Sequence, residues 1–365
     1  MKTFLDLIEE VQKPGLCHHC GGCVTFCTAV NYGALELDEN GMPRMGDKDK
    51  CIECGICYMI CPETGELDEE TRKAVDWDPP MGKAIKTTMA RSNDHEIRQR
   101  ATDGGAVTAL LLNLFERGRI DGAIVTRQMD PFHREPILAM SREEIIEAAG
   151  FHFDTSQGLK HFSHVYSSFS PSMKQLRLVI QKGLSRVAMV GTPCQIRAFR
   201  KIQTLGVVPS DAIKYCLGLF CSGNFTIGRG ERKRMAEEYG FRWEDVKRIN
   251  IKEKLMIHLK SGEIMFIPLN ELDFMKRYAC RYCSDYSAEY ADISFGGIGA
   301  DEGWTSIVIR SNLGRAIFAD ASGKTLEVYT PEEKPDFAAE ARKKIHMASE
   351  MKRNMARYNR RKIGV

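Results

Sequence analysis

Blocks of helical and strand-like hydrophobic spacing alternate along the chain after about residue 75. Apolar side chains recur at helical spacing over 107–115, and a short apolar run at 121–126 is typical of a buried strand. Ser141 and Glu144 form a capping box, which predicts a helix to residue 149. Further strands are expected at 186–190, 213–220, 291–295, 305–310 and 315–318, a β-hairpin at 256–266, and helices at 171–180, 195–203 and 331–362. This alternation predicts an α/β domain with a mixed sheet.

The first 75 or so residues follow another pattern, in which cysteines are regularly spaced. The run C-x2-C-x2-C-x3-C begins at Cys17 and again, 34 residues later, at Cys51, where Pro62 follows it and Thr28 stands at the equivalent place in the first run. This is the bacterial ferredoxin pattern for two 4Fe-4S clusters, in which the fourth cysteine of a run ligates the other cluster. We therefore expect an α+β ferredoxin-like unit. One cluster is assigned to Cys17, Cys20, Cys23 and Cys61, and the other to Cys51, Cys54, Cys57 and Cys27.

The alternatives for these thiols are structural zinc and disulfide bonds. Zinc sites usually combine separated C-x-x-C pairs, whereas here three thiols lie close together with a fourth further along. Disulfides require an oxidising compartment, and residues 1–10 contain Asp6, Glu9 and Glu10 without the long apolar run of a signal peptide. Both alternatives fit the pattern less well than iron–sulfur clusters do.

Composition and charge narrow the class of protein further. With 365 residues, 43% hydrophobic and 28% charged, the chain matches a globular protein of two or three domains. A net charge of +3 gives no indication of nucleic-acid binding, and no apolar run reaches the roughly 18 residues of a membrane span. We expect a cytoplasmic protein, or one held at the cytoplasmic face of a membrane by a partner. Consecutive prolines at 79–80 and the charged C-terminal helix suggest domains at 1–75, 76–325 and 326–365.

Five of the thirteen cysteines lie outside the two runs. Cys194 and Cys221 follow predicted strands, and Cys280 and Cys283 form a C-x-x-C pair. Strand ends are where an α/β fold gathers its site residues, so these four thiols could hold a third cluster. Core packing, a redox-active pair and half a zinc site remain open from the spacing alone. Cys216 lies within an apolar strand and is expected in the core.

Seven short stretches between residues 85 and 320 form an ordered series. They are 102–110, 118–122, 190–196, 219–223, 280–285, 291–294 and 299–310. In this order they resemble the family of β-subunits of coenzyme F420-reducing hydrogenase and related dehydrogenases. With the ferredoxin unit included, the chain is similar to the electron-input subunit of the F420 dehydrogenase of archaeal respiratory chains. Formate dehydrogenase β-subunits are the second most similar group. Ser222 and Gly297 depart from the family pattern, where many members have histidine and aspartate.

The resemblance implies an F420-dependent oxidoreductase with an α/β flavin-binding domain. It implies hydride transfer between coenzyme F420 and FAD, and a third 4Fe-4S cluster on Cys194, Cys221, Cys280 and Cys283. Single electrons would pass through the three clusters to a larger redox complex of methanogenesis: a membrane-bound dehydrogenase, a formate dehydrogenase or a heterodisulfide reductase. No residue is expected to act as a catalytic acid or base. A flavin reductase for another organic substrate and a flavin-free polyferredoxin remain as alternatives.

Several residues in the matched stretches are candidates for cofactor contact. Gly104 and Gly105 precede a helix, whose N-terminus favours a pyrophosphate, and a tight turn is the alternative. The other candidates are Thr108, Thr192, Gln195, Asp285, Asp292 and Trp304. For Thr192 and Gln195 the alternative is capping of the following helix, and for Asp285 it is capping of a turn.

Basic side chains could bind the phosphate and glutamates of F420, because arginine suits such groups. The candidates are Arg91, Arg98, Arg100, Arg197, Arg200 and Lys201. Seven basic residues of the predicted C-terminal helix could contact an acidic partner or a membrane surface: Lys343, Lys344, Lys352, Arg353, Arg357, Arg360 and Arg361. Solvent-exposed helix faces are the alternative for both groups.

Overall fold

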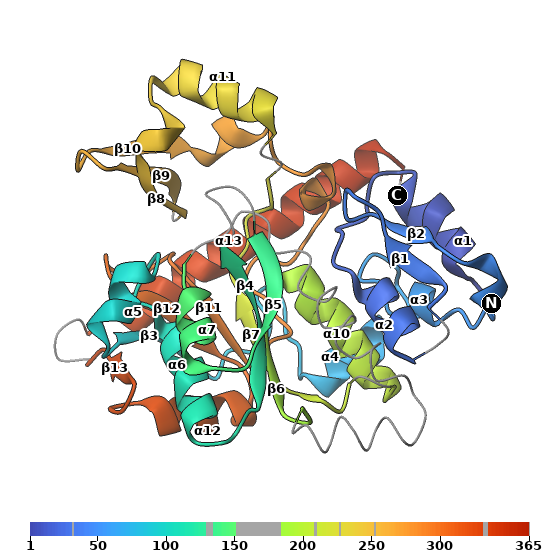
Figure 1. The fold of residues 1–365 in the computed structure, drawn as a ribbon, viewed down its shortest axis with the longest axis horizontal. Helices are drawn as coiled ribbons and strands as arrows, with labels where there is room; N and C mark the ends of the chain where they lie inside the picture. Colours follow the sequence, from blue (N-terminus) through green and yellow to red (C-terminus); the bar gives the residue numbers. More distant parts are fainter. Residues whose placement is uncertain are drawn as a thin grey trace.

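The computed structural model describes residues 1–30, 33–128, 134–150, 184–207, 210–225, 228–251, 253–330 and 335–364. These residues form a ferredoxin unit, a domain built on an eight-stranded sheet, a small three-stranded sheet and a long C-terminal helix (Figure 1). The helix expected at 171–180 lies outside the described residues.

The large sheet has the strand order β13-β3-β12-β11-β7-β6-β4-β5. Its central strands pair in parallel, and they are β11 (Ile293–Gly296), β7 (Ile213–Leu219), β6 (Val187–Gly191) and β4 (Gly122–Gln128). The flanking strands pair antiparallel, and they are β5 (Arg134–Ala139), β12 (Thr305–Ile309), β3 (Lys86–Ser92) and β13 (Leu326–Val328). The predicted mixed sheet is therefore confirmed.

Helices cover both faces of this sheet (Figure 1). Along β4, Ala123 and Val125 pack into one core, whereas Ile124 between them packs into the opposite one. This alternation follows from the two-residue period of a strand. The first face is covered by α6 (Ala106–Glu116), α7 (Arg142–Glu147) and α12 (Asn312–Ala321), and the second by α10 (Pro193–Leu205). Cys216 lies in the second core with 1% of its surface exposed, as expected.

The strand expected at 315–318 is wrong, because these residues belong to α12. Ser311 caps this helix by accepting a hydrogen bond from Gly314 N at 2.9 Å. Ile317, Phe318 and Ala321 are then buried at helical spacing. Gly314 permits close packing, because an added Cβ would lie 2.2 Å from the carbonyl oxygen of Asp292.

The ferredoxin unit consists of short elements around its own small core. They are α1 (Phe4–Leu7), η1 (Ile8–Gln12), α2 (Gly22–Val30), β1 (Leu35–Leu37), β2 (Pro43–Met45), η2 (Lys48–Lys50), α3 (Ile56–Met59) and α4 (Asp68–Ala74). Phe26 and Ile60 belong to the ferredoxin unit, but their side chains pack with α10 in the core on the second face of the large sheet. Hydrophobic packing thus joins the ferredoxin unit to the sheet domain.

The small sheet has the order β10-β9-β8 and contains the predicted hairpin. Its strands are β8 (Val246–Ile251), β9 (Lys254–Leu259) and β10 (Ile264–Pro268), and α11 (Arg229–Tyr239) precedes them. Asn250 of β8 donates hydrogen bonds to Thr102 O at 3.3 Å and to Asp103 Oδ1 at 3.1 Å. The small sheet therefore contacts the loop that ends at Gly104 and Gly105.

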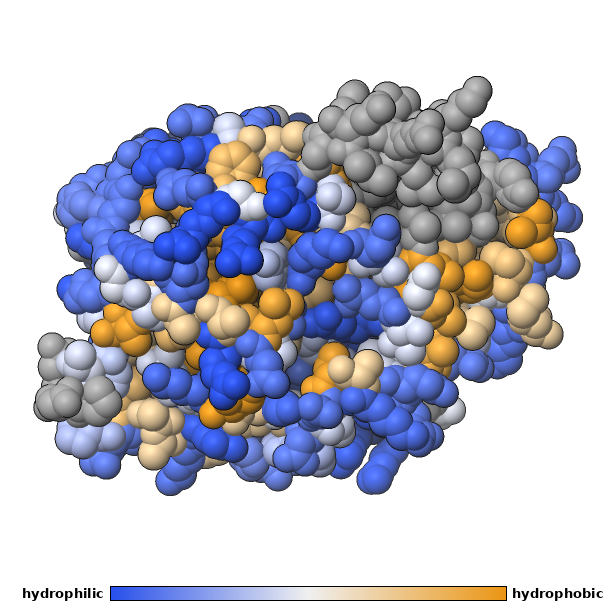
Figure 2. Space-filling model, turned by 90° about the horizontal axis from the view of Figure 1, so that it is seen from below, coloured by the Kyte–Doolittle hydropathy of each residue, from blue (hydrophilic) through white to orange (hydrophobic). Residues whose placement is uncertain are grey.

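The long helix α13 (Phe337–Lys362) connects these parts, because it runs from the large sheet to the ferredoxin unit (Figure 1). The short helix α5 (His95–Arg100) lies against β3 of the large sheet. In the part of the chain that the structure describes, no helix is both long and apolar enough to cross a bilayer. The face drawn in Figure 2 is mainly hydrophilic, with scattered apolar areas.

Candidate functional site: three sets of cysteines and an adjacent cavity

The two cysteine runs of the ferredoxin unit share the same backbone turns. The residue before the second cysteine has a left-handed backbone in both runs, with φ of 54° at His19 and 52° at Glu53. The residue after it is a glycine with positive φ, 80° at Gly21 and 72° at Gly55. A Cβ at Gly55 would lie 2.7 Å from the carbonyl oxygen of Lys2, so only glycine fits there. Turns this tight can direct three side chains of one run toward a common point.

Each run borders a narrow cavity that also receives the fourth cysteine of the other run. One cavity is lined by Cys17, Cys20, Cys23 and Cys61, and the other by Cys51, Cys54, Cys57 and Cys27. Among the described residues, no three His, Cys, Asp or Glu side chains group as ligands of one metal ion would. Thiols that surround a cavity fit a four-iron cluster better than a single tetrahedral ion.

Burial strongly affects these thiols. It raises the pKa of Cys17 to about 11 and the pKa of Cys20 to about 12. Iron binds the thiolate form, so ligation would offset the cost of burying these side chains. The donor set and its burial therefore suit iron–sulfur clusters.

Four further cysteines gather at one edge of the large sheet. Cys194 follows β6 and Cys221 follows β7, and these strands are parallel neighbours. Both cysteines therefore lie at the end of the sheet that is formed by the C-termini of the parallel strands. Cys280 lies in the short helix η5 (Tyr278–Arg281), and its Sγ accepts a hydrogen bond from Asn224 N at 3.3 Å, three residues after Cys221. Burial raises the pKa of Cys194 far above its ordinary value, and the nearby thiols of Cys283 and Cys221 raise it further.

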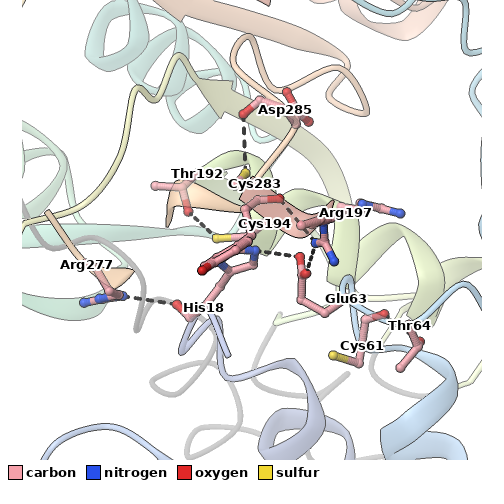
Figure 3. Close-up of polar contacts among 12 residues, drawn as sticks. His18, Cys61, Glu63, Thr64, Thr192, Cys194, Arg197, Arg277, Cys283 and Asp285 are labelled. Carbon is pink, nitrogen blue, oxygen red and sulfur yellow. Dashed lines mark hydrogen bonds and ion pairs between the residues drawn. The ribbon is translucent and has the colours of Figure 1, made fainter. Parts of the chain in front are cut away.

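This third set lies directly against the ferredoxin unit. Tyr282, between Cys280 and Cys283, is buried in the hydrophobic core of that unit. Arg277 donates a hydrogen bond to His18 O at 3.1 Å, and Cys194 lies beside His18 in Figure 3. The thiol of Cys20 also raises the pKa of Cys194 through its charge. The third set is therefore adjacent to the set that contains Cys20.

A buried ion pair lies between these two sets. His18 Nε2 is 2.7 Å from Glu63 Oε1, and both side chains are almost fully buried. Glu63 also binds Arg360 from α13 (Figure 3 shows Glu63 with its neighbours). Burial alone would raise the pKa of Glu63, but His18, Arg360 and Arg197 lower it to about 2. The contact between His18 and Glu63 has no signal in the cysteine spacing.

The diglycine loop is packed against protein on both sides. Gly104 N donates to Thr305 Oγ1 at 3.0 Å. A Cβ on Gly105 would lie 2.8 Å from Ile97 Cγ2, and Gly105 has a φ of 72°. Thr108 is buried one turn into α6. The backbone geometry alone requires both glycines, and their expected contact with a pyrophosphate stays a prediction.

The remaining flavin candidates around Cys194 bind other protein groups. Thr192 N donates to Gln195 Oε1 at 2.9 Å, and the two residues form the capping box of α10. The carboxylate of Asp285 accepts Glu289 N at 3.1 and 3.2 Å, as a turn cap does. These geometries correspond to the alternatives that the sequence left open.

Asp292 and Trp304 lie on opposite parts of the sheet domain. Asp292 Oδ2 accepts Cys216 N at 2.9 Å, and Oδ1 accepts Ser311 Oγ at 2.8 Å. Trp304 lies under the guanidinium of Arg91, 4.5 Å from its ring centroid. Of these two residues, Trp304 is nearer to the diglycine loop, because Gly303 O would lie 3.0 Å from a Cβ on Gly104.

The basic side chains of α10 that were expected to line an F420 groove bind protein carboxylates, and the groove itself stays a prediction. Arg197 NH2 lies 2.8 and 2.7 Å from the two carboxylate oxygens of Asp68, and Lys201 Nζ lies 2.9 Å from Asp68 Oδ1. Arg200 pairs with Asp292 at 3.1 Å. Protein partners also engage the other candidates, Arg91, Arg98 and Arg100.

A cavity of about 720 Å³ lies near the third set, between the small sheet, the segment after β11 and α13. Gly297 and Ile298 line it, and Ile298 packs with Phe220, the residue before Cys221. Phe266 and Met256 of the small sheet supply apolar surface. The charged lining comprises Lys254, Lys344, Glu253, Asp301, Asp336 and Glu340. Of these residues, the sequence singled out Gly297 as a departure from the family pattern and Lys344 as a basic residue of the C-terminal helix, and it did not predict the cavity.

Comparison with protein families assigns nearly every region of the chain. A profile described as the C terminus of the coenzyme F420 hydrogenase/dehydrogenase beta subunit matches residues 184–334, and the N-terminal profile matches 87–163. A 4Fe-4S dicluster domain profile matches residues 9–72.

Individual relatives agree with these matches. The chain is 32% identical over 249 residues to the beta subunit of coenzyme F420 hydrogenase of Methanosarcina barkeri, covering 67% of this chain and 81% of that protein. It is 28% identical over 320 residues to a subunit of the F(420)H(2) dehydrogenase of Methanosarcina mazei, covering 85% and 84%. A chain of the F420-reducing NiFe hydrogenase complex from Methanosarcina barkeri matches the fold with a TM-score of 0.60 and 30% identity, over 75% of this chain and 93% of that one.

Proposed function

The chain belongs to the family of coenzyme F420 hydrogenase/dehydrogenase beta subunits, and we propose that it transfers electrons between coenzyme F420 and a partner redox complex. In this role it is an oxidoreductase component rather than a complete electron-transfer chain. The comparison with subunits of hydrogenase and dehydrogenase complexes supports a multi-subunit partner. The specific partner and the direction of electron flow depend on that complex.

The observation that carries the proposal is the continuous arrangement of the three cysteine sets. The third set at the sheet edge touches the ferredoxin unit through Tyr282, and Cys20 is electrostatically close to Cys194. The second ferredoxin set, which includes Cys51, lies in the same small core as Cys17. We infer three 4Fe-4S clusters in the order third set, first set, second set. The fourfold thiol lining of each ferredoxin cavity supports the expected ligands.

FAD is the cofactor that this arrangement needs at the entrance. When bound, FAD supplies the conversion between the hydride of F420 and single electrons. We propose that it binds in the cavity of about 720 Å³, because the lining residue Ile298 packs against the same hydrophobic cluster as Phe220, the residue before Cys221. There the apolar side chains of Phe266 and Met256 would exclude water from the ring, and Lys254 would face its anionic groups, whereas Lys344 already pairs with Glu253 at 3.2 Å.

The proposed division of the chain follows from these roles. Residues 1–75 would hold two clusters, residues 76–325 would hold the third cluster and the flavin, and residues 326–365 would connect them. The C-terminal helix supports this assignment, since Arg360 binds Glu63 of the ferredoxin unit while Lys344 lines the cavity.

Composition of the anaerobically purified protein tests the proposal directly. We expect about twelve iron and twelve sulfide per chain and one FAD released by acid. Reduced F420, but not NADH, should reduce the protein. About eight iron would remove the third cluster, and the absence of flavin would overturn the proposed entrance of the pathway.

A further inference from the structure

Lys352 of α13 inserts its side chain into the third cysteine set. Its Nζ donates hydrogen bonds to Cys221 O at 2.6 Å and to Asp285 O at 2.8 Å. These carbonyls belong to one cysteine of the set and to the segment just after Cys283. The lysine therefore bridges two of the three chain segments that form the set.

The positive charge of Lys352 is not neutralised by an ion pair. Among the described residues, its only hydrogen bonds are to the two carbonyl oxygens, and no carboxylate lies within ion-pair distance. The neighbouring Arg353 is already used, because it binds both carboxylate oxygens of Glu289 at 2.7 and 2.8 Å. The carboxylate of Asp285 acts on Lys352 electrostatically but forms no ion pair with it. A partly buried cation without an ion-pair partner is costly unless another anion lies nearby.

The surrounding buried groups leave positive charge in excess. Arg310 is 2% exposed and, within the described part of the chain, donates only to neutral acceptors, including Met81 O at 2.6 Å and Ser287 O at 2.9 Å. The buried carboxylates here are those of Asp285 and Glu289, of which Glu289 is paired with Arg353. Among the described residues, Lys352, Arg353 and Arg310 thus outnumber the buried carboxylates of Asp285 and Glu289. A metal centre with net negative charge, held by the four thiols, would neutralise this excess of positive charge.

We propose that Lys352 supplies the charge that balances the third cluster and raises its reduction potential. This inference rests on the proposed function, because it requires a cluster at Cys194, Cys221, Cys280 and Cys283. A 4Fe-4S cluster with four thiolates is anionic and gains another negative charge on reduction, so a nearby cation favours the reduced form. Lys352 is then a positioning and tuning residue, since it contacts the ligand segments rather than substrate.

The residue that would balance the charge of the third cluster, Lys352, belongs to the C-terminal helix. The family profile ends at residue 334, eighteen residues before Lys352. The sequence left two expectations for the basic residues of this helix, contact with a partner or membrane and exposure to solvent, yet Lys352 faces inward. The helix therefore adds an electrostatic element to the set of cysteines supplied by the sheet domain.

The test is an anaerobic redox titration of the holoprotein, followed by electron paramagnetic resonance. The third-cluster signal is identified by its loss in Cys194→Ser. Lys352→Gln and Lys352→Met remove the charge, Lys352→Arg keeps it, and Lys343→Met removes one exposed charge from the same helix as a control. Iron is counted in every sample.

We expect a lower midpoint potential of the third cluster in Lys352→Gln and Lys352→Met, with the wild-type value in Lys352→Arg and Lys343→Met. Loss of about four iron from both neutral variants, with full iron in Lys352→Arg, also supports the proposal. An unchanged midpoint in the neutral variants overturns it. About eight iron in the wild type would instead refute the third cluster itself, which separates failure of the proposed function from failure of this inference.

Discussion

Lys201 Nζ lies 2.9 Å from Asp68 Oδ1 and joins the helix that begins beside Cys194 to the last helix of the ferredoxin unit. The lysine side chain is fully buried and also donates to Cys61 O at 2.9 Å and Thr64 O at 3.0 Å. Burial lowers the pKa of Lys201, and the nearby Arg197 lowers it further. Asp68 therefore holds two buried cations at the boundary between the third and first cysteine sets.

Replacing Asp68 should loosen this boundary. Asp68→Asn leaves Lys201 and Arg197 buried without their shared carboxylate, and we expect a loss of about 3–5 kcal/mol of stability. Thermal unfolding of the anaerobic holoprotein measures the change. Asp49→Asn is the matched control, because Asp49 is exposed in the same unit. Equal unfolding temperatures for the two variants would show that the ion pairs do not hold the units together.

Tyr282 should be the main apolar anchor of the third set. Tyr282→Ala removes a buried ring from the ferredoxin core and should cost about 3–5 kcal/mol. Tyr282→Phe loses only the hydrogen bond to Tyr278, 2.6 Å long, and should cost about 1 kcal/mol. Chemical denaturation of both variants distinguishes packing from the hydroxyl contact. Similar losses in the two variants would assign the effect to the hydroxyl instead.

The exchange of fourth cysteines between the two runs predicts a specific pattern of signal loss. Cys27→Ala should abolish the same paramagnetic signal as Cys51→Ala, and Cys61→Ala the same signal as Cys17→Ala. Cys216→Ala should leave iron content unchanged, because Cys216 lies in the core. If Cys27→Ala removed the signal that depends on Cys17, each run would hold its own cluster.

Much of the fold was predictable because its signals are local. Continuous apolar runs identify β6 and β7, and the Ser141 cap identifies the start of α7. The failure at Ile317 and Phe318 has a physical reason, since two adjacent apolar residues fit a short strand as well as one face of a helix. Strand order was not predictable, because β3 pairs with β12 and β13, which are more than two hundred residues away.

In the candidate site, too, the sequence predicts the local features but not those that depend on packing between distant segments. Cysteine spacing is local, so the sequence alone could group the ferredoxin thiols. The inward positions of Lys201 and Lys352 depend on helices that pack against distant segments, and their composition resembles that of exposed basic faces. Tyr282 had no distinguishing pattern at all, because its burial comes from a separate unit of the chain.

The most direct test of the pathway compares the wild type with Cys194→Ser, each mixed anaerobically with reduced F420. In the wild type we expect reduction of the flavin followed by loss of the visible absorbance of the ferredoxin clusters. In Cys194→Ser the flavin should still be reduced, while the ferredoxin clusters remain oxidised until a chemical reductant is added. Reduction of those clusters at the wild-type rate in Cys194→Ser would contradict the proposed route through the third set.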